Sequence, residues 1–158
     1  SIIDLYSYGH DIESSWLIDW GCDLLGDRAL SAAIHFIDSD LARSIYSHAY
    51  RDHSLLNECE RGVDNTTRVW WVQAEAVLGF VNEYQKSGDP KYRDAAAGIW
   101  HYITEKILDK RPGGEWFWSV DASGVPASRQ PIVEPWKCPY HNGRMCMELI
   151  RRDPHVEV

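Results

Sequence analysis

Apolar side chains recur every three or four residues over five stretches of the chain, which is the spacing that places them on one face of an α-helix. Gly26 and the run Gly88-Asp89-Pro90 have the composition of helix ends. The pattern predicts five helices, over residues 10–25, 28–50, 67–87, 90–108 and 142–152. The sequence shows no low-complexity segment and no flexible linker between them. The 158 residues are therefore expected to form part of a single domain of the all-α class.

Short β elements are expected in the connections between these helices. Ser54–Glu58 has the composition of a short strand. The aromatic and β-branched run Glu115–Val120 precedes Asp121–Gly124, and together they are typical of a strand and a hairpin turn. The prolines that follow predict a loop over residues 122–137. The sequence thus predicts long antiparallel helices joined by loops, one of which carries a small β-hairpin.

Composition and charge narrow the classes of function. The formal net charge is −8 and the basic residues are scattered, which argues against nucleic acid as a partner. No apolar run approaches the roughly 20 residues that a membrane-spanning helix needs, so we expect no membrane segment. The four cysteines contain no CxxC pair and match no zinc-binding spacing. Their pattern favours reduced thiols in a cytoplasmic protein without a bound metal.

Two helical stretches carry polar residues of catalytic type. His10, Glu13 and Trp16 are three residues apart, so they share one face at the start of the first predicted helix. A carboxylate beside an imidazole can hold its tautomer, although acidic residues also occur there simply because they favour the positive end of a helix. Trp71 and Glu75 share a face of the third predicted helix. Glu75 stands among alanines, so it needs a partner across the fold or a substrate.

A third candidate lies in the loop before the last predicted helix. The run from Glu134 to Arg144 is interrupted by prolines and delivers His141 at the beginning of the helix, where a rigid loop can present a catalytic group. A capping role for His141 or Asn142 is the alternative. The chain also contains eight tryptophans, a residue that forms flat platforms for sugars as well as packing in cores. Glu115 and its neighbouring aromatic residues could line a sugar cleft, or they could belong to a hairpin that packs on the helices.

These stretches are similar to the N-acylglucosamine 2-epimerase superfamily, and most closely to its cellobiose 2-epimerases. The resemblance rests on four segments in the family's order and spacing, namely YGHDIESSW, RVWWVQAEAVLGF, GEWFWSVD and WKCPYHNGRMCMELIRR. It covers the whole chain. Members of the family fold as a ring of twelve helices, an (α/α)6 barrel, and the five predicted helices resemble the last five. The resemblance therefore implies a partial barrel, the C-terminal portion of a longer domain whose N-terminal half is absent.

The resemblance also implies roles for individual residues. His10 and His141 resemble the two general acid/base histidines of the family. Glu13 and Glu75 resemble the carboxylates that orient them or bind sugar hydroxyls. The aromatic residues that pack on or around the sugar are matched by Trp16, Trp71 and Trp136. The implied reaction is epimerisation at C2 of the reducing-end glucose or mannose of a disaccharide such as cellobiose, without a cofactor.

Other functions fit the same residues. An N-acylglucosamine 2-epimerase or an aldose–ketose isomerase would use the same scaffold, and a glycoside hydrolase would use Glu13 and Glu75 as its carboxylate pair. A carbohydrate-binding module without catalysis is the alternative that is not an enzyme. The chain alone is expected to be inactive, and to self-associate through apolar helix faces that the rest of a ring would cover.

Overall fold

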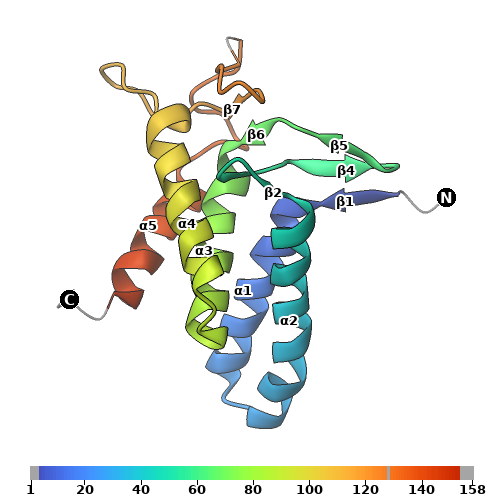
Figure 1. Cartoon of the computed structure of the whole chain (residues 1–158). Coiled ribbons are helices and arrows are strands. Elements are labelled where there is room, and N and C mark those ends of the chain that lie inside the picture. The colour runs from blue at the N-terminus through green and yellow to red at the C-terminus, as the bar shows by residue number, and fades with distance from the viewer. Residues whose placement is uncertain (1–3, 128, 154–158) are drawn as a thin grey trace.

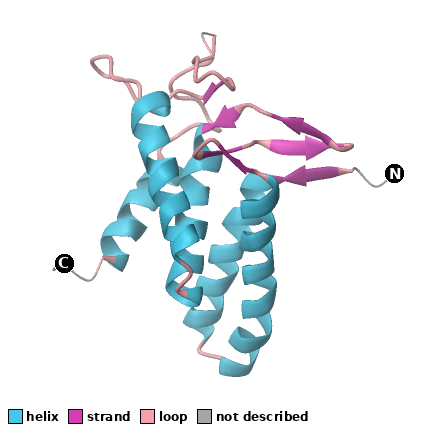
Figure 2. Ribbon diagram, in the orientation of Figure 1, coloured by secondary structure: helices cyan, strands magenta, loops and turns pink. Residues whose placement is uncertain are grey.

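The computed structural model describes residues 4–127 and 129–153 of the chain. The helices predicted from the sequence are confirmed, and they make the described part of the chain predominantly helical (Figure 2). They are α1 (Tyr8–Leu25), α2 (Arg28–His48), α3 (Trp70–Ser87), α4 (Pro90–Tyr102) and α5 (Tyr140–Arg152). The fourth helix continues as a π-helical segment, η1 (Ile103–Ile107), so it ends where the apolar pattern predicts.

Local chemistry explains most of the helix boundaries. Gly26 ends α1 in the left-handed conformation, with φ of 68°, and its N–H donates to the carbonyl of Asp23. Asp27 then begins α2, because its carboxylate accepts the N–H groups of Ala29 and Leu30. The start predicted for α3 is wrong by three residues, since Arg68–Val69 pair as a strand instead of joining the helix.

Helix α3 is the centre of the fold. Twelve of its eighteen residues are buried, and it packs against α1, α4 and α5, while α2 packs on α1. Figure 1 shows that α1, α3 and α5 run in one direction, whereas α2 and α4 return in the other. This alternation gives an inner set of three parallel helices backed by two outer ones. The N-terminal ends of α1, α3 and α5 consequently lie at the same end of the bundle.

The strands lie at that same end (Figure 1). They form three small antiparallel units: a sheet of order β1-β4-β5, the pair β2-β3 and the pair β6-β7. Their bounds are β1 (Leu5–Ser7), β2 (Tyr50–Arg51), β3 (Ser54–Leu55), β4 (Glu58–Glu60), β5 (Val63–Asn65), β6 (Arg68–Val69) and β7 (Ser119–Val120). The strand predicted over residues 54–58 is therefore two elements, β3 and the start of β4. The three-stranded sheet was not predicted.

The predicted hairpin is only partly present. Its turn is confirmed, because the N–H of Gly124 donates to the carbonyl of Asp121 at 2.9 Å. The preceding strand is shorter than predicted, since only Ser119–Val120 is extended and paired. It pairs with β6, more than forty residues earlier in the chain, and also forms a bridge with the next segment, from Val120 to Pro126. The pairing with β6 brings the aromatic run before β7 to the beginning of α3. There the backbone N–H of Trp70 donates to the carbonyl of Trp118.

Two further expectations can be compared with the structure. No helix in residues 4–127 and 129–153 is long and apolar enough to cross a membrane. The four cysteines, Cys22, Cys59, Cys138 and Cys146, are all free thiols, as the sequence predicted. The cytoplasmic location that accompanied that prediction stays a prediction.

One buried carboxylate in this fold has no hydrogen-bond partner among the described residues. Asp38 of α2 is 1% exposed, and neither of its carboxylate oxygens is bonded. Burial raises its pKa to about 6; Lys86 opposes this shift, while Asp19 and Glu83 add to it. The usual pKa of an aspartate is near 3.8, so folding favours the protonated form. The stability that this proton provides is complete below pH 3.8 and is lost as the pH rises through 6.

Replacing Asp38 with asparagine is expected to remove this pH dependence. The wild type should lose about 2 kcal/mol of unfolding free energy between pH 4 and pH 8 that Asp38→Asn does not lose. Urea denaturation at both pH values measures the shift. Asp40→Asn, at an exposed position of the same helix, is the control and should show no such change. An equal pH response of Asp38→Asn and the wild type would contradict a buried, proton-binding Asp38.

Candidate active site

A pocket of about 400 Å³ opens at the N-terminal ends of the three inner helices. Histidines, aromatic rings and one carboxylate line it: His10, Glu13, Trp70, Trp71, Trp118, Trp136, Tyr140 and His141. The first two come from α1, the next two from α3 and the last two from α5. Because helix N-termini carry partial positive charge, their convergence favours negative charge that develops in the pocket.

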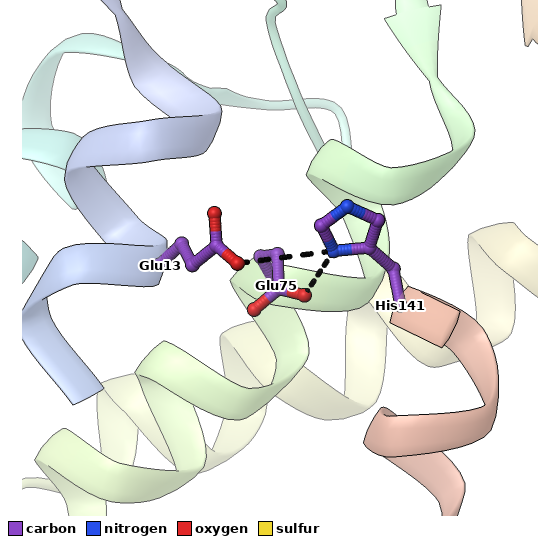
Figure 3. Close-up of side chains that lie close together, drawn as sticks. All are labelled: Glu13, Glu75 and His141. Carbon is purple, nitrogen blue, oxygen red and sulfur yellow. Dashed lines mark hydrogen bonds and ion pairs between the residues drawn. The ribbon is translucent and has the colours of Figure 1, made fainter. Parts of the chain in front are cut away.

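His141 is the most constrained side chain of the pocket. Its Nδ1 atom lies 2.6 Å from Oε1 of Glu75, and its ring packs against Trp71 and Tyr140 with centroid distances of 5.2 and 4.0 Å. Figure 3 shows the other ring nitrogen, Nε2, turned away from Glu75 and Glu13. A carboxylate at Nδ1 retains the proton on that atom, so Nε2 is the atom that can take up or release a proton. The alternative of a simple capping role is not supported, since α5 has no side-chain cap bond.

Glu75 holds this arrangement from below the pocket. It is completely buried, and its Oε2 atom accepts a hydrogen bond of 2.9 Å from Nε1 of Trp16, which is itself completely buried. Trp16 therefore does not line the pocket and cannot pack on a sugar there. Its place in the structure is that of an orienting residue for Glu75, since it occupies the oxygen that His141 does not use.

Arg144 is the cation that sequence analysis did not assign to Glu75. Its Nη2 atom lies 2.6 Å from Glu13 and 2.7 Å from Glu75, and its guanidinium stands 5.2 Å from the ring centre of Trp16. Burial would lower the pKa of Arg144, but the hydrogen bonds and charges of Glu75 and Glu13 hold it above its ordinary value. The available signal was spacing, because Arg144 follows His141 by three residues on one helix face.

The same groups could be considered for a metal ion. One ligand atom each from Glu13, Glu75 and His141 lies within 4.8 Å of the others. However, Nη2 of Arg144 already contacts both carboxylates, and Nδ1 of His141 is engaged with Glu75. The positive charge that balances the two glutamates is therefore a guanidinium, and the donor set does not fit a divalent cation in this arrangement.

His10 lines the pocket from α1 and is exposed. Its Nδ1 atom is 2.6 Å from Oγ of Ser7, and its ring centroid is 4.8 Å from that of Trp71. Ser7 occupies the N-cap position of α1 but makes no capping hydrogen bond with its side chain, so its hydroxyl serves the histidine instead. Gly9 allows this approach, because a Cβ there would come within 2.5 Å of the Trp71 ring.

The structure therefore brings together most of the residues predicted from the sequence. His10, Glu13, Trp71 and His141 line one pocket with Trp136, whose side chain is 79% exposed. Three further aromatic residues line the pocket. Trp70 is a core residue as expected, at 1% exposure, and it also borders the pocket. Trp118 was left between a core and a site role, and Tyr140 had no assigned role.

Comparison with known proteins identifies the class to which this fold and site belong. The family model described as "N-acylglucosamine 2-epimerase (GlcNAc 2-epimerase)" matches residues 5–142. The chain belongs to this family. The helices are accordingly part of an (α/α)6 barrel, as the sequence predicted.

Several of the similar proteins are cellobiose 2-epimerases. That of Eubacterium cellulosolvens is 49% identical over 151 residues, and that of Ruminococcus albus is 50% identical over 149 residues. These matches cover 96% and 94% of this chain but only 37% and 38% of the two relatives. A solved sugar epimerase from a ruminal bacterium superposes with a TM-score of 0.95 and 48% identity, over 99% of this chain and 40% of that one. The chain thus spans less than half the length of these relatives.

Proposed function

We propose that this chain is part of a carbohydrate 2-epimerase, which interconverts the glucose and mannose configurations at the reducing end of a disaccharide such as cellobiose. The observation that carries the proposal is that His10 and His141 line one aromatic pocket, each held through Nδ1 by a neighbouring side chain. Relatives about 50% identical to the chain bear the name of this activity.

The chemistry needs two proton carriers. In the open-chain sugar, the proton on C2 is acidic because the neighbouring C1 carbonyl accepts the electron pair and forms an enediolate. One imidazole removes this proton, and the other, as an imidazolium, returns a proton to the opposite face of the planar intermediate. The C–H bond broken and the C–H bond formed are on the same carbon, so only the configuration changes. Histidine suits both roles near neutral pH.

Each part of the pocket has a task in this scheme. The helix N-termini of α1, α3 and α5 stabilise the negative charge of the enediolate. The glutamates and Arg144 hold His141 in one tautomer. The exposed faces of Trp71 and Trp136 provide apolar surface for the C–H faces of the sugar. Proton transfer between these groups requires no metal ion and no nucleotide cofactor.

We further propose that the chain is the C-terminal portion of the barrel domain and that the rest of the parent protein completes the pocket. Apolar side chains on α1 and α2 are exposed here and would be covered by further helices. They include Leu24, Leu25, Phe36 and Ile37, which are 73%, 72%, 72% and 56% exposed. The isolated chain should consequently self-associate, and a monomer at micromolar concentration in sedimentation velocity would contradict this expectation.

The geometry speaks against a glycoside hydrolase. Both glutamates contact the same Nη2 atom of Arg144, and Glu75 is completely buried. Two carboxylates that cleave a glycosidic bond must flank it, at roughly 5 to 10 Å from one another and with access to the sugar. Glu13 and Glu75 face each other across a guanidinium instead, so they orient His141 rather than attack a substrate.

Product analysis tests the proposed substrate. The complete parent protein is incubated with cellobiose, mannose and N-acetylglucosamine, and the sugars are separated by chromatography. We expect glucosyl-mannose from cellobiose. Conversion of N-acetylglucosamine alone would indicate an N-acylglucosamine 2-epimerase, and a ketose product would indicate an isomerase. Binding of the sugars without any conversion would favour a carbohydrate-binding protein and contradict the proposal.

Removing the hydroxyl of Ser7 tests the role of His10. Ser7→Ala should lower kcat about tenfold with little change in KM, because His10 loses the partner that holds its Nδ1 atom. Ser7→Thr keeps a hydroxyl and should retain most of the activity. Steady-state kinetics on the complete parent protein measures both variants. Equal kcat values for Ser7→Ala and the wild type would show that the hydroxyl does not serve catalysis.

A further inference from the structure

A buried lysine lies directly behind the pocket. Lys137 is 1% exposed, and its Nζ atom pairs with Oε2 of Glu115 and donates to the carbonyl of Ile132 at 2.7 Å. The same ammonium group stands 5.1 Å from the ring centre of Trp70, which lines the pocket. Burial of an ammonium group is unfavourable unless it is paired and hydrogen-bonded, and here both conditions are met.

Lys137 also closes the turn that carries Trp136. Its backbone N–H donates to the carbonyl of Glu134 at 2.9 Å, and its carbonyl accepts the N–H of Glu134 at 3.1 Å. Trp136 lies inside this turn with 79% of its side chain exposed. The place of the Trp136 ring over the pocket therefore depends on the backbone of the turn, which the buried side chain of Lys137 anchors.

Glu115 connects this turn with the beginning of α5. Its second oxygen, Oε1, accepts a hydrogen bond from Nδ2 of Asn142, the residue that follows His141. Glu115 itself precedes Trp116 in the segment that leads to β7. One carboxylate thus joins two segments of the site: Oε2 reaches the turn of Trp136 through Lys137, and Oε1 reaches the helix end of His141 through Asn142.

We propose that Glu115, Lys137 and Asn142 are positioning residues for the epimerase reaction, with Lys137 placing Trp136 for sugar binding and Asn142 placing His141 for proton transfer. This inference rests on the proposed function. None of the three lines the pocket, so they act through their neighbours. Because the two oxygens of Glu115 serve different segments, loss of one arm should affect binding and loss of the other should affect the chemical step.

Steady-state kinetics of the complete parent protein separates the two arms. Lys137→Met should raise KM for cellobiose about tenfold and change kcat less than about threefold, because the Trp136 platform is displaced. Asn142→Ala should lower kcat about tenfold and change KM less than about threefold, because His141 is displaced. Lys110→Met is the matched control, since Lys110 forms an exposed pair with Glu105, and it should leave both constants unchanged.

A double variant distinguishes positioning from mere stabilisation of the fold. Lys137→Met alone leaves the Glu115 carboxylate without its cation and should lower the melting temperature. Glu115→Gln combined with Lys137→Met removes both charges and should recover the melting temperature, while KM stays raised because no anchor for the turn is restored. If Lys137→Met alone does not fold, KM of the double variant tests the positioning role. Recovery of KM together with the melting temperature would overturn the positioning role.

The outcome for the wild type separates this inference from the proposed function. A wild-type protein that forms no epimer from any of the three sugars contradicts the proposed function, and the positioning roles with it. An active wild type whose KM is unchanged by Lys137→Met and whose kcat is unchanged by Asn142→Ala contradicts the positioning roles alone.

Discussion

Replacing His141 with asparagine is expected to lower kcat for epimerisation by about three orders of magnitude. The asparagine amide can still donate to Glu75 in place of Nδ1, so the buried carboxylate keeps a partner. What is lost is Nε2, the atom that would exchange a proton with C2 of the sugar. Since Trp71 and Trp136 keep their places, KM should change less than about threefold.

His101→Asn is the control for this prediction. His101 is exposed on α4, an outer helix, and does not line the pocket. Its replacement should leave kcat and KM unchanged. A His141→Asn variant that keeps more than about a tenth of the wild-type kcat would show that this histidine is not the proton carrier.

Replacing Arg144 with methionine is expected to destabilise the protein by about 3 kcal/mol. The change leaves Glu13 and the completely buried Glu75 without the cation that lies within 2.7 Å of both. Because both carboxylates contact the same Nη2 atom, they are close enough to repel one another once it is removed. A buried charge without a partner is also costly. The unfolding free energy from urea denaturation at pH 7 measures the loss, and activity should fall with it because Arg144 no longer holds Glu75, the partner of His141.

A second arginine of the same helix provides the comparison. Arg151 forms a more exposed pair with Glu148, so Arg151→Met should cost less than about 1 kcal/mol. Adding Glu13→Gln to Arg144→Met removes one of the two opposing carboxylates and should recover part of the stability. Equal losses for the two arginine variants would contradict a special role of Arg144 in balancing the glutamates.

The helices could be predicted because their signal is local. Ile12 and Trp16 on α1, and Ala74 and Val77 on α3, recur at helical spacing and are buried as that spacing predicts. The strands could not be predicted in the same way. Leu5–Ser7 pairs with Glu58–Glu60 across more than fifty residues, and neither segment is long enough to show alternation. Short strands of this kind are defined by their partners rather than by their own composition.

The two histidines of the pocket could be predicted from the sequence, but the residues that support them could not. His10 and His141 stood out because imidazoles at helix starts are suited to proton transfer, and the family resemblance marked both. Arg144 was visible only as part of a small basic cluster, since nothing in one sequence says which carboxylates lie across the fold. Lys137 was missed for the same reason. Trp16 was expected to face the sugar, because a helix face alone does not distinguish a core from a pocket.

Proton exchange at C2 tests the central claim most directly. The complete parent protein and its His10→Ala and His141→Ala variants are incubated with cellobiose in D2O and followed by NMR. The account predicts glucosyl-mannose that carries deuterium at C2 with the wild type, and strongly reduced exchange with each variant. Full exchange at C2 in both variants, or epimer formed by the wild type without deuterium at C2, would contradict the two-histidine mechanism.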